Sequence, residues 1–196
     1  MKTDKGRFSR HSFPRLLVLV PHRDVRLPMR AWSGSLFAAG LPGAWSFPWV
    51  APLAALASPL PEAELKSLAH ALREHSRPNG GKFTAGPSAF AQLPFATGGK
   101  PAFAFGPSLD VAFPSAFFAI EDSAPLKQIL PVVLGAALAY DPPPDGLPAP
   151  PQISFRASAL AVMRFRPLPL GNKCVGGYQG ELSFEWEIGK LHWLPK

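Results

Sequence analysis

The chain has almost no cysteine, since Cys174 is the single thiol among 196 residues. One thiol excludes an intramolecular disulfide, and with only five scattered histidines it excludes a closed metal-ligand set of the Cys/His type. We therefore expect neither a metal nor another cofactor, and we expect a reducing, cytoplasmic location.

Long apolar runs are also missing from the sequence. The first run, Leu16 to Pro21, is too short for the core of a signal peptide and far too short to span a bilayer. We therefore expect a soluble protein without a membrane partner.

The motifs of the common enzyme classes are absent as well. There is no Gly-x-Ser-x-Gly nucleophile turn, and Gly98-Gly99-Lys100 is followed by proline instead of the helix that a phosphate loop needs. His22-Arg23-Asp24 resembles the catalytic triplet of protein kinases, but Met29 stands where the metal-binding asparagine would be. A polar loop at the exit of the first strand is the better interpretation of this triplet, and such loops often carry ligands.

What the sequence does have is apolar residues, proline and an uneven charge. Hydrophobic residues make up 47%, enough for a full core, and 25 prolines indicate many short elements joined by rigid turns. Residues 1–30 hold eight basic and two acidic side chains, a net charge of +6 out of a total of +7. A basic segment of this kind attracts phosphate or another anionic partner.

Hydrophobic periodicity and turn residues predict a mixed set of elements. In chain order they are a strand at 16–20, a helix at 28–40, a strand at 44–56 that lies at a sheet edge or contains bulges, a helix at 62–74, a hairpin within 82–113, a short helix at 123–129, a strand or buried helix at 130–138, a proline-rich linker at 141–151, and a closing strand pair at 153–168 and 182–194.

The last strand alternates apolar and polar residues from Ser183 to Ile188, which is typical of an antiparallel strand with one solvated face. Glu185 and Glu187 share that face, and we expect an arginine of the preceding strand opposite them: Arg156, Arg164 or Arg166.

The order of these elements carries one resemblance. The strand Phe47 to Leu56, the segment Leu130-Pro-Val-Val-Leu-Gly135, the segment Phe155 to Met163 and Tyr178 near the closing strand resemble the 2H phosphoesterases, the LigT and cyclic phosphodiesterase group. The resemblance implies an α+β, bilobal fold of duplicated β-α-β units, with two mainly antiparallel sheets around a central cleft. Residues 1–14 would form a basic N-terminal arm, and residues 15–196 a single bilobal domain.

The two His-x-Thr/Ser motifs of that family, which supply its acid and base, are both missing. The first belongs on the strand Phe47 to Leu56, where Trp49 and Ala51 stand instead, and the second belongs near residues 131–135. None of the five histidines is followed at the second position by Thr or Ser. We therefore expect no catalytic residue and no standard 2H phosphodiesterase activity, because such groups contribute about 10² to 10⁴-fold each.

Two functions stay open at this stage. The first is a 2H-like scaffold whose cleft binds a phosphate-bearing ligand, such as a nucleotide or RNA end, through His22, Arg23, Arg26, Trp49 and Arg156. The second is a protein-interaction or homodimerisation module that uses the aromatic residues near Trp45 and Trp49 and the proline-rich linker.

Overall fold

The computed structural model describes residues 15–41, 43–44, 47–56, 60–97, 100–111, 113, 126–139, 145–168 and 181–192, and it describes the side chains of these residues except 95–97, 100, 164–168 and 181–192. The expected basic arm at 1–14, the start of the short helix expected at 123–129, Trp45, Tyr178 and the first part of the proline-rich linker lie outside the described residues.

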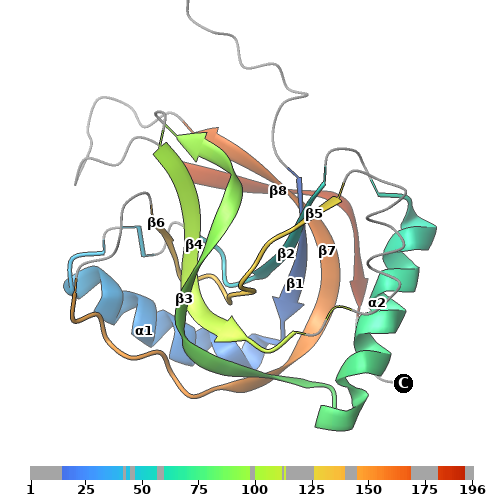
Figure 1. Ribbon diagram of the computed structural model, residues 1–196, viewed down its shortest axis with the longest axis horizontal. Helices are drawn as coiled ribbons and strands as arrows, with labels where there is room; N and C mark the ends of the chain where they lie inside the picture. Colours follow the sequence, from blue (N-terminus) through green and yellow to red (C-terminus); the bar gives the residue numbers. More distant parts are fainter. Residues whose placement is uncertain are drawn as a thin grey trace, which may run out of the picture.

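The described chain is an α+β fold with two α-helices and eight strands in one connected antiparallel sheet (Figure 1). In chain order the elements are β1 (Arg15–Pro21), the 3₁₀ helix η1 (Arg23–Val25), α1 (Arg26–Ala38), β2 (Ala51–Leu56), α2 (Glu62–Ser76), the 3₁₀ helix η2 (Arg77–Asn79), β3 (Lys82–Thr97), β4 (Lys100–Leu109), β5 (Leu126–Gln128), β6 (Ala137–Ala139), β7 (Ser154–Leu168) and β8 (Glu181–His192).

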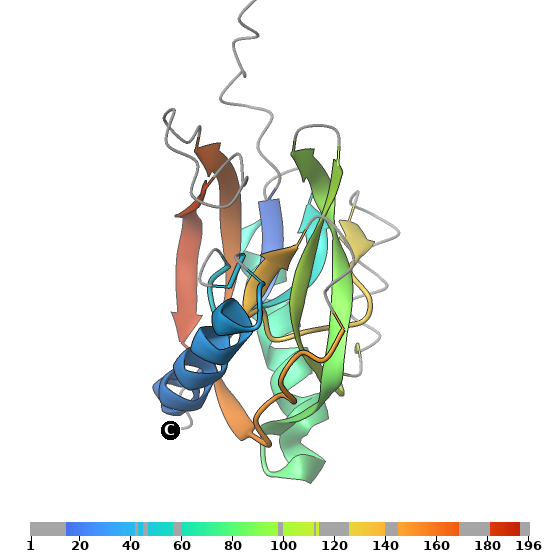
Figure 2. The same ribbon diagram turned by 90° about the vertical axis from the view of Figure 1, so that its left-hand side faces the viewer.

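Seven strands follow the order β5-β2-β1-β7-β3-β4-β6, and β8 pairs with β7 beside this path. β7 is therefore the branch point, since its first residues pair with β3 while the rest of it pairs with β1 and β8. Figure 2 shows the β3–β4 hairpin lying across from β7 and β8. The α+β class and the antiparallel pairing agree with the prediction, but the strands form one connected sheet where two sheets were expected.

Both faces of β1 are buried, against different partners. Leu17 and Leu19 share a core cluster with Met29 of α1 and Leu68 of α2, so the helices cover this face. Each fully buried leucine of this kind contributes roughly 1.5–3 kcal/mol to folding. Leu16 and Val18 instead join a second apolar cluster, whose other members come from β3, β4, β6, β7 and the segments beside β2, β5 and β6: Phe47, Val50, Ala91, Leu93, Ala102, Ala104, Ile129, Val133, Leu138, Ala161 and Met163.

This second cluster lies between the β1–β7 part of the sheet and the β3–β4 hairpin, in the interior where the resemblance implies a central cleft. All of its core members are buried. In the described residues the interior is thus filled with apolar side chains.

Several boundaries differ from the sequence prediction for local reasons. β2 begins only at Ala51 and is an inner strand between β1 and β5. Its register with β1 shifts beside Pro52. Of the two predicted alternatives, the bulge is therefore present and the edge position is wrong. Residues 126–128 form β5 instead of a helix. β4 continues through Gly106, where the absence of a side chain lets the carbonyl oxygen of Leu134 pack against the strand.

Candidate anion-binding site

Two distant segments meet at the end of β1. The amide of His22, the residue directly after β1, donates a hydrogen bond of 2.8 Å to the carbonyl oxygen of Arg156 in β7. The pairing of Pro21 with Ala157 brings the two strands into this register. A residue of the polar loop and an arginine 134 positions further along the chain are therefore held next to each other by backbone contacts.

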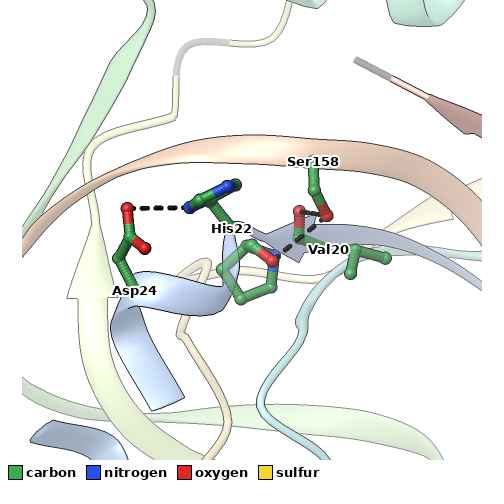
Figure 3. A network of polar contacts seen from close by, with 5 residues as sticks. Val20, His22, Asp24 and Ser158 are labelled. Carbon is green, nitrogen blue, oxygen red and sulfur yellow. Dashed lines mark hydrogen bonds and ion pairs between the residues drawn. The ribbon is translucent and has the colours of Figure 1, made fainter. Parts of the chain in front are cut away.

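A β-bulge sets which way this part of β7 faces. Val20 pairs with Ala159 and Pro21 with Ala157, so Ser158 is the one extra residue on β7. Its hydroxyl lies 3.2 Å from the carbonyl oxygen of Val20 and 3.1 Å from that of Pro21 and donates to them (Figure 3). A hydrogen bond from the side chain of the inserted residue supports the local break in the ladder.

The bulge changes the alternation of buried residues along β7. Phe155 and Ala157 are buried before the bulge, and Leu160 and Val162 belong to the same core cluster after it. Without the extra residue, strict alternation would put these two pairs on opposite faces. Arg156 is thereby left exposed on the side away from Phe155.

His22 is held from one side by an acidic neighbour. Its Nδ1 lies 2.8 Å from Oδ2 of Asp24, with 41% of the His22 side chain and 78% of the Asp24 side chain exposed (Figure 3). This contact orients the ring and leaves Nε2 for another partner. Because both groups are solvated, the contact itself contributes little to stability.

Lys82, the first residue of β3, stands directly opposite Arg156 on the neighbouring strand. Both side chains are exposed, and the next pair, Phe83 and Phe155, points into the core with ring centroids 5.9 Å apart. Among the described residues, neither cation forms an ion pair. Like charges directly opposite each other on antiparallel strands are destabilising.

A small pocket of about 100 Å³ adjoins Lys82. It lies between the end of α2 and the start of β3 and is lined by Leu72, His75, Ser76, Asn79, Lys82, Phe83 and Asp110. Asp110 is the acidic residue of this pocket, and the ion pairs found among the described residues do not include one between it and Lys82.

The structure brings some of the sequence-predicted ligand residues together. His22 and Arg156 share a backbone contact, while Arg23 and Arg26 follow in η1 and at the start of α1 with exposed side chains. Trp49 is partly buried and packs against the core cluster that the helices share. Its ring therefore belongs at least partly to the core. Sequence reasoning missed Lys82, because its only signal is the register between β3 and β7.

The two segments that the resemblance assigns to the missing motifs lie side by side. The amide of Gly135 donates to the carbonyl oxygen of Val50 at 2.9 Å, and the ring of Phe47 packs where a side chain of Gly135 would be. Val50, Val133 and Leu134 are all buried. Apolar side chains thus occupy this junction, which offers no group for proton transfer.

Two further features bear on the class of protein. In the described parts of the chain, no helix has both the length and the hydropathy needed to cross a membrane. In the same residues, no group of three or more His, Cys, Asp or Glu side chains is placed so that it could hold a metal ion.

Comparison with family models, curated proteins and solved structures finds no match to this chain. Its function therefore has to be argued from its own residues.

Proposed function

We propose that this chain is a 2H phosphoesterase-like protein that binds a phosphate-bearing ligand, such as a nucleotide or RNA end, without turning it over. The ligand binds at the end of β1, against Lys82 and Arg156, with His22, Arg23 and Arg26 on the adjoining loop and helix. Because the interior is filled, the site lies at this end of the sheet and not between its two parts.

The observation that carries the proposal is the pairing of Lys82 with Arg156. In the free protein this arrangement is unfavourable, because two exposed cations face each other and no carboxylate of the described residues is paired to either. An anion placed between them removes the repulsion and gains charge-assisted hydrogen bonds, which are about twice as strong as neutral ones. Folding alone gives no reason to keep such a pair, whereas anion binding does.

Binding without turnover is supported by the junction of Val50 and Gly135. If the resemblance holds, the acid and base of the family would project here, and buried apolar side chains stand in their place. His22, with its Nδ1 on Asp24, serves in this proposal as a hydrogen-bond donor to the ligand.

Calorimetry at low salt with inorganic phosphate, cyclic nucleotides and short RNA tests the proposal. We expect Arg156→Gln and Lys82→Gln each to weaken binding about tenfold or more, because hydrogen bonds to charged groups contribute about 1.5–3 kcal/mol. Lys127→Gln is the matched control, since Lys127 is an exposed cation on the edge strand β5.

The free energy of unfolding of the same two variants distinguishes a pair of residues that binds a ligand from a pair that serves the fold. Either substitution should leave the free protein as stable as before or slightly more stable, because it removes the repulsion. The absence of heat with every probe, or equal affinities in Arg156→Gln and Lys127→Gln, would contradict the proposal.

A further inference from the structure

The outer face of α1 carries large apolar side chains in contact with solvent. Leu27 is 80% exposed and Phe37 is 54% exposed, while the inner face of the same helix buries Met29, Trp32 and Leu36. These two residues lie ten positions apart, about 15 Å along the helix axis. In Figures 1 and 2 the helix lies at the periphery of the molecule.

Arginines share this face with the apolar residues. At about 100° per residue, Arg26, Arg30 and Phe37 fall within about 40° of one another, and Leu27 lies about 60° beyond Arg30, opposite Leu36, so the four residues span about 100° of the helix surface. Arg26 and Arg30 are exposed and one turn apart, where like charges repel. The sequence of α1 contains no carboxylate to relieve this repulsion.

We infer that the outer face of α1, defined by Arg26, Leu27, Arg30 and Phe37, docks on an anionic phospholipid surface. The two arginines favour a partner surface with negative charge. The exposed leucine and phenylalanine favour a surface that also accepts apolar side chains. The boundary between lipid headgroups and acyl chains offers both within a few ångströms. The net charge of +6 in residues 1–30 adds to the same attraction.

A nucleic acid fits this face less well. Its phosphates would pair with Arg26 and Arg30, but an aliphatic side chain as exposed as Leu27 gains nothing from a phosphate backbone. A second copy of the chain fits less well too, because α1 brings no carboxylate to pair with the arginines of its partner. The contact inferred here lies on a bilayer and does not cross it, so it is independent of the absence of a spanning segment.

Co-sedimentation of the full chain with vesicles tests this inference. We expect partitioning onto vesicles of phosphatidylcholine mixed with phosphatidylserine at low salt, little onto phosphatidylcholine alone, and a decrease as added salt screens the charges. Leu27→Ser and Phe37→Ser should each lower the partition coefficient about tenfold. Arg30→Gln should lower it about fivefold.

Arg73→Gln is the matched control, because Arg73 is an exposed arginine on the other helix, and it should partition like the native chain. Native circular dichroism of each variant shows that a loss is not caused by unfolding. The inference is overturned if the native chain stays in the supernatant at low salt, or if Leu27→Ser partitions as well as the native chain. It is also overturned if short RNA, and not the vesicles, binds in a Leu27-dependent way.

The same variants keep this inference separate from the proposed function. Arg156→Gln should lose phosphate binding and keep vesicle binding, while Leu27→Ser should do the reverse. Arg26 belongs to both sites, so the test uses Arg156 and Leu27, each of which belongs to one site alone.

Discussion

Gly135 donates its amide hydrogen to the carbonyl oxygen of Val50 over 2.9 Å, and this bond joins the segment before β6 to the segment before β2. The contact is close because Gly135 has no side chain, and the ring of Phe47 occupies the space that a Cβ would need. The two segments therefore fit together only with glycine at this position.

Gly135→Ala should destabilise the protein by about 1–3 kcal/mol, the usual cost of forcing an extra methyl group into a packed core. Urea unfolding measures the change. In a Phe47→Leu background, where the smaller side chain leaves room, the same substitution should cost less. Strictly additive free energies for the two substitutions would show that Phe47 does not limit this space.

Ser158→Ala should cost about 1 kcal/mol, because the hydroxyl that donates to the carbonyl oxygens of Val20 and Pro21 is lost at the bulge. Ser154→Ala, an exposed serine on the same strand, is the control and should stay within about 0.5 kcal/mol of the native protein. Thermal unfolding of both variants is sufficient, and equal stabilities would mean that the bulge does not need the hydroxyl.

Trp32→Phe tests whether the proline-rich segment is docked. The indole nitrogen of Trp32 donates to the carbonyl oxygen of Pro148 at 3.0 Å, and the ring packs against Phe105 with centroids 5.8 Å apart. Phenylalanine keeps the packing and loses the donor, so we expect a loss of about 1 kcal/mol and shifted amide resonances in residues 145–149. Unchanged resonances there would show that the segment lies on α1 without this bond.

Lys66→Met should raise the pKa of Glu62. In the native chain a hydrogen bond from Lys66 at 2.7 Å, reinforced by its charge, lowers the pKa of the Glu62 carboxyl below its ordinary value. A pKa lowered on folding adds stability above the pKa of the unfolded chain, and that increment is lost as the pH falls through the folded pKa.

The stability difference between the native protein and Lys66→Met should therefore shrink in acid. A carbon-detected NMR titration of Glu62 and urea unfolding at neutral and acidic pH measure the two effects. Lys127→Met is the control. An unchanged pKa of Glu62 in Lys66→Met would refute the assignment of the cause.

Elements with strong periodicity could be predicted from the sequence. The helix at 62–74 is α2, extended by two residues, and the closing strands are β7 and β8. Arg164 stands opposite Glu185, which confirms one of the three partners expected for the acidic face of the last strand. The other two arginines are paired in register with other residues: Arg156 stands opposite Lys82, and Arg166 stands opposite Ser183.

The segment from 126 to 138 could not be predicted, because its conformation depends on distant backbone. Ile129 donates to the carbonyl oxygen of Leu53, and Leu134 to that of Pro107, so partners far away in the sequence hold this stretch extended. A run of apolar residues contains no pattern that indicates such distant hydrogen-bond partners. The position of Lys82 beside Arg156 could not be predicted for the same reason, because it follows only from the pairing of β3 with β7.

The position of Arg156 near the start of β7 also bears on how the proposed anion site would respond to a ligand. Its backbone is held on two sides, by the pairing with Lys82 of β3 and by the hydrogen bond from the amide of His22 to its carbonyl oxygen. The backbone around Arg156 is therefore preorganised, and at this pair of residues a ligand has side chains and not backbone to order when it binds. Differences in affinity between ligands should then come from the contacts that they make and not from the cost of reshaping the protein.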